Sequence, residues 1–191
     1  MGMAAPIYYT ADQVRSLPED GNRYELVHGE LLVTPAPRAL HQELVRRLLV
    51  ALSRYLEVEP VAHVLPAPAD ISWGPDTLVQ PDVFVVPMEQ ARTLDWTRMK
   101  DLLLVAEVLS PSSARADRFT KRTEYQRRRV PVYWIVDPEE RRVEVWVPDD
   151  TAPRFERERL LWHPAGATRP FELDLQELFD RSNVLSVSRL T

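Results

Sequence analysis

The run LLLVAEVLSPSS, residues 102–113, constrains the fold more than any other stretch of this sequence. Its first eight positions are apolar except for one, and the run is closed by Ser-Pro. A short continuous apolar run of this kind predicts a strand that is buried on both faces in the middle of a sheet. Glu107 interrupts the run, and an unpaired carboxylate in such a strand is costly unless it keeps a proton. The sequence therefore predicts a specific partner for Glu107.

Composition describes an ordinary soluble globular protein. The chain has 191 residues, 45% hydrophobic and 28% charged, which suits a single domain spanning 1–191. No apolar run approaches the roughly 20 residues that a membrane span needs, and the N-terminus lacks the pattern of a secretory signal. There are no cysteines, which excludes disulfides, thiolate zinc sites and cysteine nucleophiles. We expect a cytoplasmic protein that does not associate with membranes.

Hydrophobic periodicity predicts a chain of mixed helices and strands. The expected helices are an amphipathic one over 41–56, a basic one over 113–129 and a short one over 171–179. The expected strands are a hairpin over 24–35 turning at His28-Gly29, then 63–73, 78–87, 102–109, 132–138, 141–148 and a piece near 154–162. Residues 88–100 look like a polar connection. The predicted fold class is α/β, with α+β as the alternative: a mixed central sheet flanked by helices, with an N-terminal hairpin.

Three polar residues stand out against this frame. Asp82 follows Pro81 at the start of an apolar strand, Glu107 lies in the next strand, and Lys121 lies in the helix after that. Sequential strands usually neighbour each other, so the two carboxylates are expected to converge. Two close carboxylates repel, and a hard divalent cation such as Mg²⁺ removes that repulsion through oxygen ligands. A nearby lysine can orient or deprotonate an attacking water, or stabilise the charge that develops at phosphorus.

The rarity of lysine supports a role for Lys121. Of 24 basic residues only Lys100 and Lys121 are lysines. Arginine stays charged and cannot serve as a base, whereas lysine can shift its pKa and acts as a compact point charge. A retained lysine in an arginine-rich chain is therefore modest, independent support for chemistry at that position.

Several unusual sequence motifs, in their order along the chain, resemble a known family. LVQPDVFVV, LVAEVLSPSS, the Asp117-Lys121-Tyr125 spacing and VPVYWIVDPEERRVEVW are similar to the Uma family of bacterial putative restriction endonucleases, within the PD-(D/E)XK nuclease superfamily. YELVHGELLVTPAP and PFELDLQELF fit the ends of that family, so the resemblance covers nearly the whole chain. The superfamily pattern would place its lysine two residues after Glu107, where this chain has Leu109. The Uma pattern moves the lysine to the following helix, and Lys121 matches it.

The resemblance implies a restriction-endonuclease-like fold and a metal centre. The leading hypothesis is a Mg²⁺-dependent endonuclease, with Mn²⁺ as a substitute, that hydrolyses phosphodiester bonds in DNA. Asp82, Glu107 and the backbone carbonyl of Val108 would bind the metal, and Lys121 would position or activate the attacking water. The competing hypothesis is a non-catalytic binding or assembly module that retains the nuclease fold. A homodimer is compatible with cutting both strands of a duplex.

The charge distribution leaves the mode of DNA contact open. The net charge of −5 argues against a protein that grips duplex DNA through a broad basic face. Residues 115–129, in contrast, carry seven basic and two acidic side chains, which would meet backbone phosphates or form a solvated helix face.

Several other residues are open candidates. Glu25 and Glu43 are more simply structural, Asp70 has no fixed register, and Tyr125 either contacts a phosphate or holds the helix. His41 is expected to pack or cap the first long helix. The chain has no G-x-S-x-G, P-loop or G-x-G-x-x-G motif, which argues against a serine hydrolase and a nucleotide-cradling loop.

Overall fold

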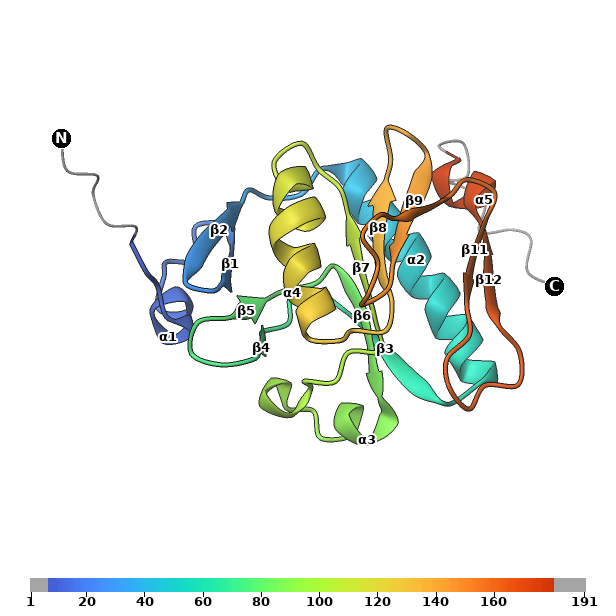
Figure 1. The fold of residues 1–191 in the computed structure, drawn as a ribbon, viewed down its shortest axis with the longest axis horizontal. Coiled ribbons are helices and arrows are strands. Elements are labelled where there is room, and N and C mark those ends of the chain that lie inside the picture. Colours follow the sequence, from blue (N-terminus) through green and yellow to red (C-terminus); the bar gives the residue numbers. More distant parts are fainter. Residues whose placement is uncertain (1–6, 181–191) are drawn as a thin grey trace.

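A six-stranded mixed sheet forms the centre of the protein. The computed structural model describes residues 7–180 (Figure 1). The sheet has the order β10-β9-β8-β7-β6-β3, in which β7 and β8 run parallel and the other neighbours antiparallel. Its strands are β3 (Ala62–Pro66), β6 (Val83–Pro87), β7 (Leu104–Val108), β8 (Tyr133–Asp137), β9 (Arg142–Trp146) and β10 (Arg154–Glu156). The predicted mixed central sheet is confirmed, and the apolar run supplies its interior strand β7.

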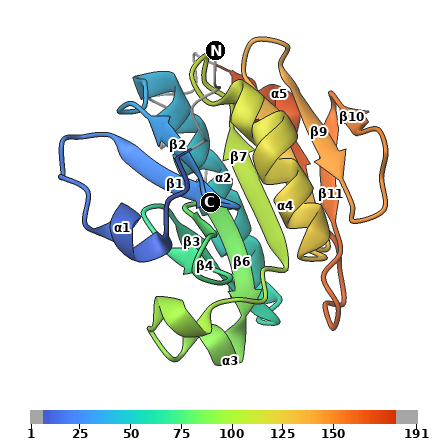
Figure 2. The ribbon, with the colours of Figure 1, turned by 60° about the vertical axis from the view of Figure 1, so that its left-hand side comes forward.

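Helices cover both faces of this sheet (Figure 2). On one face lies α2 (Ala39–Val58), whose buried Leu44, Leu48 and Leu52 pack with Val83 and other strand residues in one apolar core. On the other face lies the helical segment made of a π-helix (η2, Ala116–Lys121) and α4 (Arg122–Arg127). Successive strand residues point to opposite faces, so Val105 and Glu107 share the α4 side of β7. The carboxylate of Glu107 therefore faces the helix that carries Lys121.

A second, antiparallel sheet of four strands flanks α4, with the order β2-β1-β5-β4. It contains the predicted N-terminal hairpin, β1 (Arg23–Val27) and β2 (Glu30–Thr34), together with β5 (Leu78–Val79) and β4 (Ile71–Ser72). A short helix, α1 (Ala11–Arg15), is capped by Thr10 and Gln13 and packs against β1. The sequence pattern did not predict α1.

Two predicted strands are each divided between the sheets. The expected strand 63–73 forms β3 and β4, which are separated at the cis Ala67-Pro68 bond, and 78–87 forms β5 and β6, separated at Gln80-Pro81-Asp82. Proline cannot donate a ladder hydrogen bond, so a proline inside an apolar run ends pairing on one sheet. The prediction of two continuous strands was wrong. The division matters because it leaves Asp82 at the junction of the two sheets.

The remaining elements refine other predictions. The polar connection contains α3 (Met88–Ala91) and a 3₁₀ turn, η1 (Trp96–Arg98), and the piece near 154–162 forms β10 and β11 (Arg159–Trp162). The segment predicted as a helix over 171–179 is half strand: β12 (Phe171–Asp174) pairs with β11 before α5 (Leu175–Phe179) begins. The Asp174 side chain accepts from the backbone N–H groups of Gln176 and Glu177, and this cap starts the helix. Across residues 7–180, no helix combines the length and apolarity needed to cross a membrane.

Candidate active site

Sheet register brings Asp82 and Glu107 together. β6 and β7 are antiparallel neighbours with Val83 opposite Ala106, so Asp82 lies beside Glu107. The backbone N–H of Asp82 donates to Glu107 Oε2 over 3.3 Å, and the N–H of Val108 donates to Asp82 Oδ2 over 2.9 Å. The predicted neighbouring of these two strands is confirmed.

Lys121 reaches Glu107 from the last residue of the π-helix. Its Nζ lies 2.5 Å from Glu107 Oε1, 2.9 Å from Glu25 Oε1 and 3.4 Å from Asp117 Oδ1. The side chain is 1% exposed, which makes Lys121 a buried cation among carboxylates. A π-helical turn is rare in helices and is found disproportionately at functional sites. Lys121 is thus the partner that the sequence required for Glu107.

The pKa values of Asp82 and Glu107 are shifted in opposite directions. Burial raises the pKa of Glu107 well above its ordinary value of 4.5, with Lys121 opposing the shift and the neighbouring carboxylates adding to it. Burial alone would also raise the pKa of Asp82, but the hydrogen bond with His41 and the charge of Arg23 outweigh burial and lower it. Asp82 therefore keeps its charge to lower pH than an ordinary aspartate, whereas Glu107 holds its proton to higher pH than an ordinary glutamate. Such divergent shifts in one site are typical of functional carboxylates.

Burial alone would lower the pKa of Lys121, but Glu107 and Glu25 outweigh burial and raise it. The lysine in this arrangement is a cation and not a base. Its chemistry is then that of a positioned positive charge and hydrogen-bond donor.

Acids outnumber fixed cations in this buried cluster. Lys121 and Arg23 are the cations that contact it, and Arg23 lies 2.6 Å through Nη1 from Asp82 Oδ1 and 3.6 Å through Nε from Glu25 Oε2. The buried acids in contact with these two side chains are Asp82, Glu107, Glu25 and Asp117. Four acids facing two fixed cations leave two negative charges to be neutralised by protons or by a cation.

The structure also decides which open candidates join the site. Glu25 contacts Lys121, and the Tyr125 hydroxyl donates to Glu107 Oε1 over 3.1 Å. Asp70 is held by Gln80, 2.9 Å away, and does not contact the cluster directly. Glu43 pairs with arginines of its own helix.

Sequence reasoning missed Arg23 and the contact that the buried His41 makes with Asp82. The imidazole of His41 lies on the first turn of α2 with Nε2 3.1 Å from Asp82 Oδ2, so it supports the site instead of merely packing or capping the helix. Arg23 and Glu25 lie two residues apart on β1, so their side chains point to the same face of the strand. This spacing is the one sequence signal that links Arg23 to the site. That signal becomes informative only when the hairpin is known to pair with β5, the strand that leads to Asp82.

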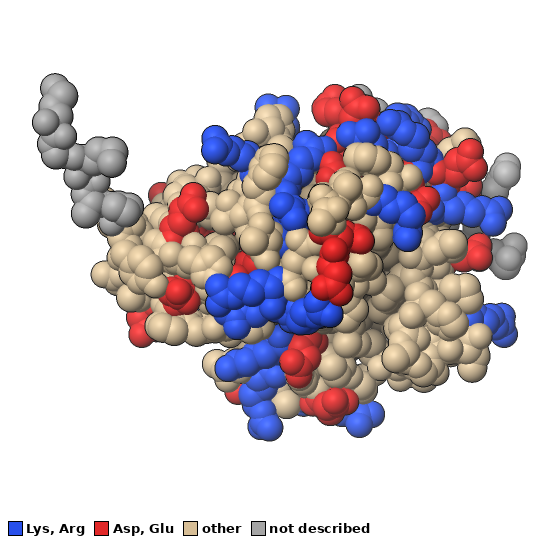
Figure 3. Space-filling model, viewed as in Figure 1, with Lys and Arg blue, Asp and Glu red and all other residues tan. Residues whose placement is uncertain are grey.

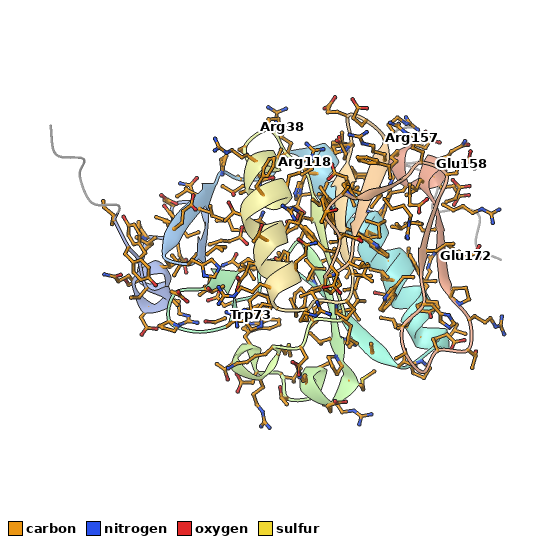
Figure 4. The ribbon with its side chains drawn as sticks, in the orientation of Figure 1. Arg38, Trp73, Arg118, Arg157, Glu158 and Glu172 are labelled. Atoms are coloured by element: carbon orange, nitrogen blue, oxygen red, sulfur yellow. The ribbon has the colours of Figure 1, made fainter. Side chains whose placement is uncertain are left out.

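A cleft of about 520 Å³ ends at Asp82. Arg23, Arg38 and His41 line it, and its rim is formed by the loops around 19–22, 34–37 and 110–112. Figure 4 shows Arg38 at the end of the molecule where the chain enters the α4 segment. Glu107 and Lys121 lie behind Asp82 and do not line the cleft. The approach to the site thus carries positive side chains, while the floor is acidic.

Part of the positive charge of the predicted basic helix is paired with acids, whereas Arg115 is exposed and has no ion pair among residues 7–180. Arg118 pairs with Asp137 and Glu144, and Arg129 with Asp149. Arg128 pairs with Glu124, and Lys121 is buried. Figure 3 shows acidic and basic side chains interspersed over this face. These ion pairs favour the interpretation of a solvated, largely internally paired helix face.

The donor set at the junction fits a hard divalent cation. Asp82 and Glu107 supply carboxylate oxygens, and the N–H and C=O of a strand residue point to the same side, so the Val108 carbonyl faces Asp82 as its N–H does. Within residues 7–180, no three acidic or histidine side chains form a complete metal cage. Mg²⁺ does not need one, because it binds through one or two carboxylates and keeps several waters. Its double charge would balance the excess of two acids over fixed cations when all four acids are ionised.

Comparisons with known proteins agree with this fold. The profile of the Uma2 family, described as "Putative restriction endonuclease", matches residues 11–180, and the chain belongs to that family. A crystal structure of a putative nuclease belonging to DUF820 from Anabaena variabilis superposes with a TM-score of 0.73 at 19% identity. The match covers 89% of this chain and 97% of the other, so the two share a nuclease-like fold. No curated protein matches the chain.

Proposed function

We propose that this protein is a Mg²⁺-dependent endonuclease that hydrolyses phosphodiester bonds in DNA, with Mn²⁺ able to replace Mg²⁺. The observation that supports the proposal most strongly is the buried cluster at the junction of the sheets. There Asp82, Glu107 and Lys121 meet with two acids more than fixed cations, at the end of a cleft lined by arginines. Membership of a family described as restriction endonucleases supports DNA as the substrate.

Asp82, Glu107 and the carbonyl of Val108 would hold the ion, which when bound supplies Lewis-acid stabilisation to the phosphate and lowers the pKa of a ligated water. The protein's own part is to fix these ligands. The Tyr125 hydroxyl holds Glu107 Oε1, while His41 and the Val108 N–H hold Asp82 Oδ2. Ligands held by outer partners in this way keep one orientation, and their loss typically costs metal affinity or activity.

Lys121 would position the attacking water and stabilise negative charge that develops at phosphorus. Its ammonium is anchored by Glu25 and Asp117, 2.9 Å and 3.4 Å away. Because those carboxylates keep it charged, Lys121 acts through its charge and its N–H donors, not by accepting a proton. A group other than Lys121, such as solvent, would then accept the proton of the attacking water.

Cleavage of supercoiled plasmid and of single-stranded DNA tests the proposal. Reactions contain Mg²⁺, Mn²⁺ or EDTA, and compare the wild type with Glu107→Gln and Lys121→Ala. Lys100→Ala is the matched control, since Lys100 is the other lysine of the chain and is exposed. We expect cleavage that needs the divalent ion, is lost in both site variants while they stay folded, and is retained in Lys100→Ala. A wild type that binds the ion but cuts neither substrate at any enzyme concentration would favour the non-catalytic binding module.

A further inference from the structure

Arg23 binds Asp82, the same carboxylate that the proposed divalent ion would bind. Its Nη1 donates to Asp82 Oδ1 over 2.6 Å and to the Gln80 carbonyl over 3.2 Å. Asp82 Oδ2 is taken by His41 and the Val108 N–H. Both oxygens of Asp82 thus have protein donors, and an ion that binds this carboxylate would compete with them for its lone pairs.

Arg23 is the donor that can leave. The Val108 N–H is fixed in the backbone of β7, and His41 is 8% exposed on the first turn of α2. The Arg23 side chain is 19% exposed and lines the open cleft, so its guanidinium has room beside it. A divalent ion on Asp82 would also repel the guanidinium from the same oxygen.

The displaced guanidinium would enter the space that the substrate must cross. Arg23 lines the wall where the cleft meets Asp82. Glu25 Oε2 lies 3.6 Å from Arg23 Nε and would stay close to it after the guanidinium turns. The planar guanidinium fork matches the geometry of a phosphate oxygen pair.

We propose that Arg23 exchanges partners: it neutralises Asp82 until a divalent ion binds there, and then turns into the cleft to bind a phosphate oxygen of the nucleic acid. This inference rests on the proposed function, since it assigns a phosphate ligand for the same site. It makes Arg23 a substrate-binding residue whose contribution depends on the metal. Arg38 lines the same cleft and has no side-chain partner among residues 7–180, so its contribution to phosphate binding does not depend on the metal.

The first measurement is Mn²⁺ binding without DNA, by calorimetry, for the wild type, Arg23→Ala, Arg23→Gln and Glu107→Gln. Removing the competing cation should tighten Mn²⁺ binding in Arg23→Ala by about tenfold, a coupling of ordinary size between two ligands of one site. Arg23→Gln keeps a hydrogen-bond donor for Asp82 without the charge, so it should change in the same direction if Arg23→Ala fails to fold. Glu107→Gln should weaken Mn²⁺ binding. Weaker Mn²⁺ binding in both Arg23 variants would show that Arg23 only supports Asp82, and would overturn the exchange.

The second measurement is the affinity for a fluorescent single-stranded oligonucleotide, by anisotropy, in Ca²⁺ and in EDTA. Arg23→Ala should lose about tenfold in affinity in Ca²⁺ and change little in EDTA, because the guanidinium reaches the phosphate only when the ion holds Asp82. Arg38→Ala should lose affinity equally in both buffers. An equal loss for Arg23→Ala in both buffers would overturn the exchange.

These outcomes separate the inference from the function beneath it. If the wild type binds neither Mn²⁺ nor DNA, the proposed function fails and the exchange fails with it. If the wild type binds both and Arg23→Ala behaves like it in both measurements, only the exchange is wrong.

Discussion

Two fully buried glutamates lie at the same helical segment and differ in the cations that they meet: Glu124 belongs to α4, and Glu107 faces it from β7. Glu107 and Glu124 are both 0% exposed. Glu124 is met by Arg128 at 2.6 Å and by His28 at 2.8 Å, side chains that are 26% and 42% exposed. Glu107 is met by Lys121, which is itself 1% exposed and shared with two further acids.

The difference shows what distinguishes a candidate active site from a structural ion pair. Two arginines, Arg128 and Arg127, reach Glu124 from the surface, so this single acid does not outnumber its fixed cations. The cations around Glu107 are outnumbered by buried acids, and a divalent ion would restore the balance. Burial of a carboxylate is therefore a weak sign of function, and unbalanced buried charge is a stronger one.

The largest expected effect is on catalysis. Glu107→Gln removes a proposed metal ligand while keeping the shape of the side chain, and we expect cleavage to fall by about 10²–10³-fold or more. Glu124→Gln is the matched change in the other cluster and should cut plasmid within a few-fold of the wild type. Initial rates of nicking in Mg²⁺ compare them. Equal losses in both variants would remove the distinction between the clusters.

The second largest expected effect is on the free energy of unfolding, which should distinguish the cluster around Glu107 from that around Glu124. Lys121→Ala leaves Glu107 and Glu25 buried without their cation, and breaking such a pair is expected to cost about 3–5 kcal/mol in the free energy of unfolding. Chemical denaturation in EDTA measures it. Adding Glu107→Gln to Lys121→Ala should recover part of the loss, because one buried charge is then removed. A double variant less stable than Lys121→Ala would contradict that charge balance.

The pH dependence of stability should carry the mark of Glu107. Because its pKa is raised in the folded state, the folded protein binds this proton more tightly than the unfolded chain. The stabilisation is full below the unfolded pKa, near 4.5, and is lost as the pH rises through the raised folded pKa. In EDTA, wild-type unfolding free energy should fall across this range with a slope of at most about 1.4 kcal/mol per pH unit, and Glu107→Gln should flatten it. Asp82 acts in the opposite sense and at lower pH, since its pKa is lowered and its stabilisation is lost on acidification. A slope that is the same in wild type and Glu107→Gln would show that another group titrates.

The smallest expected effect comes from the surface cations of the second cluster. Arg128→Ala removes one partner of Glu124, but His28 and Arg127 still reach the same carboxylate. We expect a loss of about 1–2 kcal/mol in chemical denaturation and no change in Mn²⁺ affinity. A loss as large as that of Lys121→Ala would mean that Glu124 depends on a single cation as Glu107 does.

The sequence was most informative where a residue contradicts its surroundings. Glu107 in an apolar strand predicted a partner, and neighbouring strands predicted its approach to Asp82; the structure confirms that approach. Lys121 was singled out because the chain otherwise uses arginine, and it is the lysine that lies on Glu107.

Sequence patterns failed where a partner comes from a distant segment. Nothing local to Arg23 or His41 indicates a contact with Asp82, because the hairpin and the first turn of α2 approach it only through tertiary packing. The π-helical turn was also missed, since apolar spacing does not distinguish it from an α-helix. Prolines were recognised as punctuation, but not as the points where one apolar run changes sheets. The metal ligands, the cofactor and the single domain over 1–191 stay predictions.

Anomalous scattering from a crystal grown with Mn²⁺ tests the central claim most directly. The account predicts one peak at the junction of the two sheets, in contact with carboxylate oxygens of Asp82 and Glu107 and with the carbonyl of Val108. A fully occupied Mn²⁺ site elsewhere in the protein, with Asp82 still bonded to Arg23 and Glu107 still bonded to Lys121, would contradict the account.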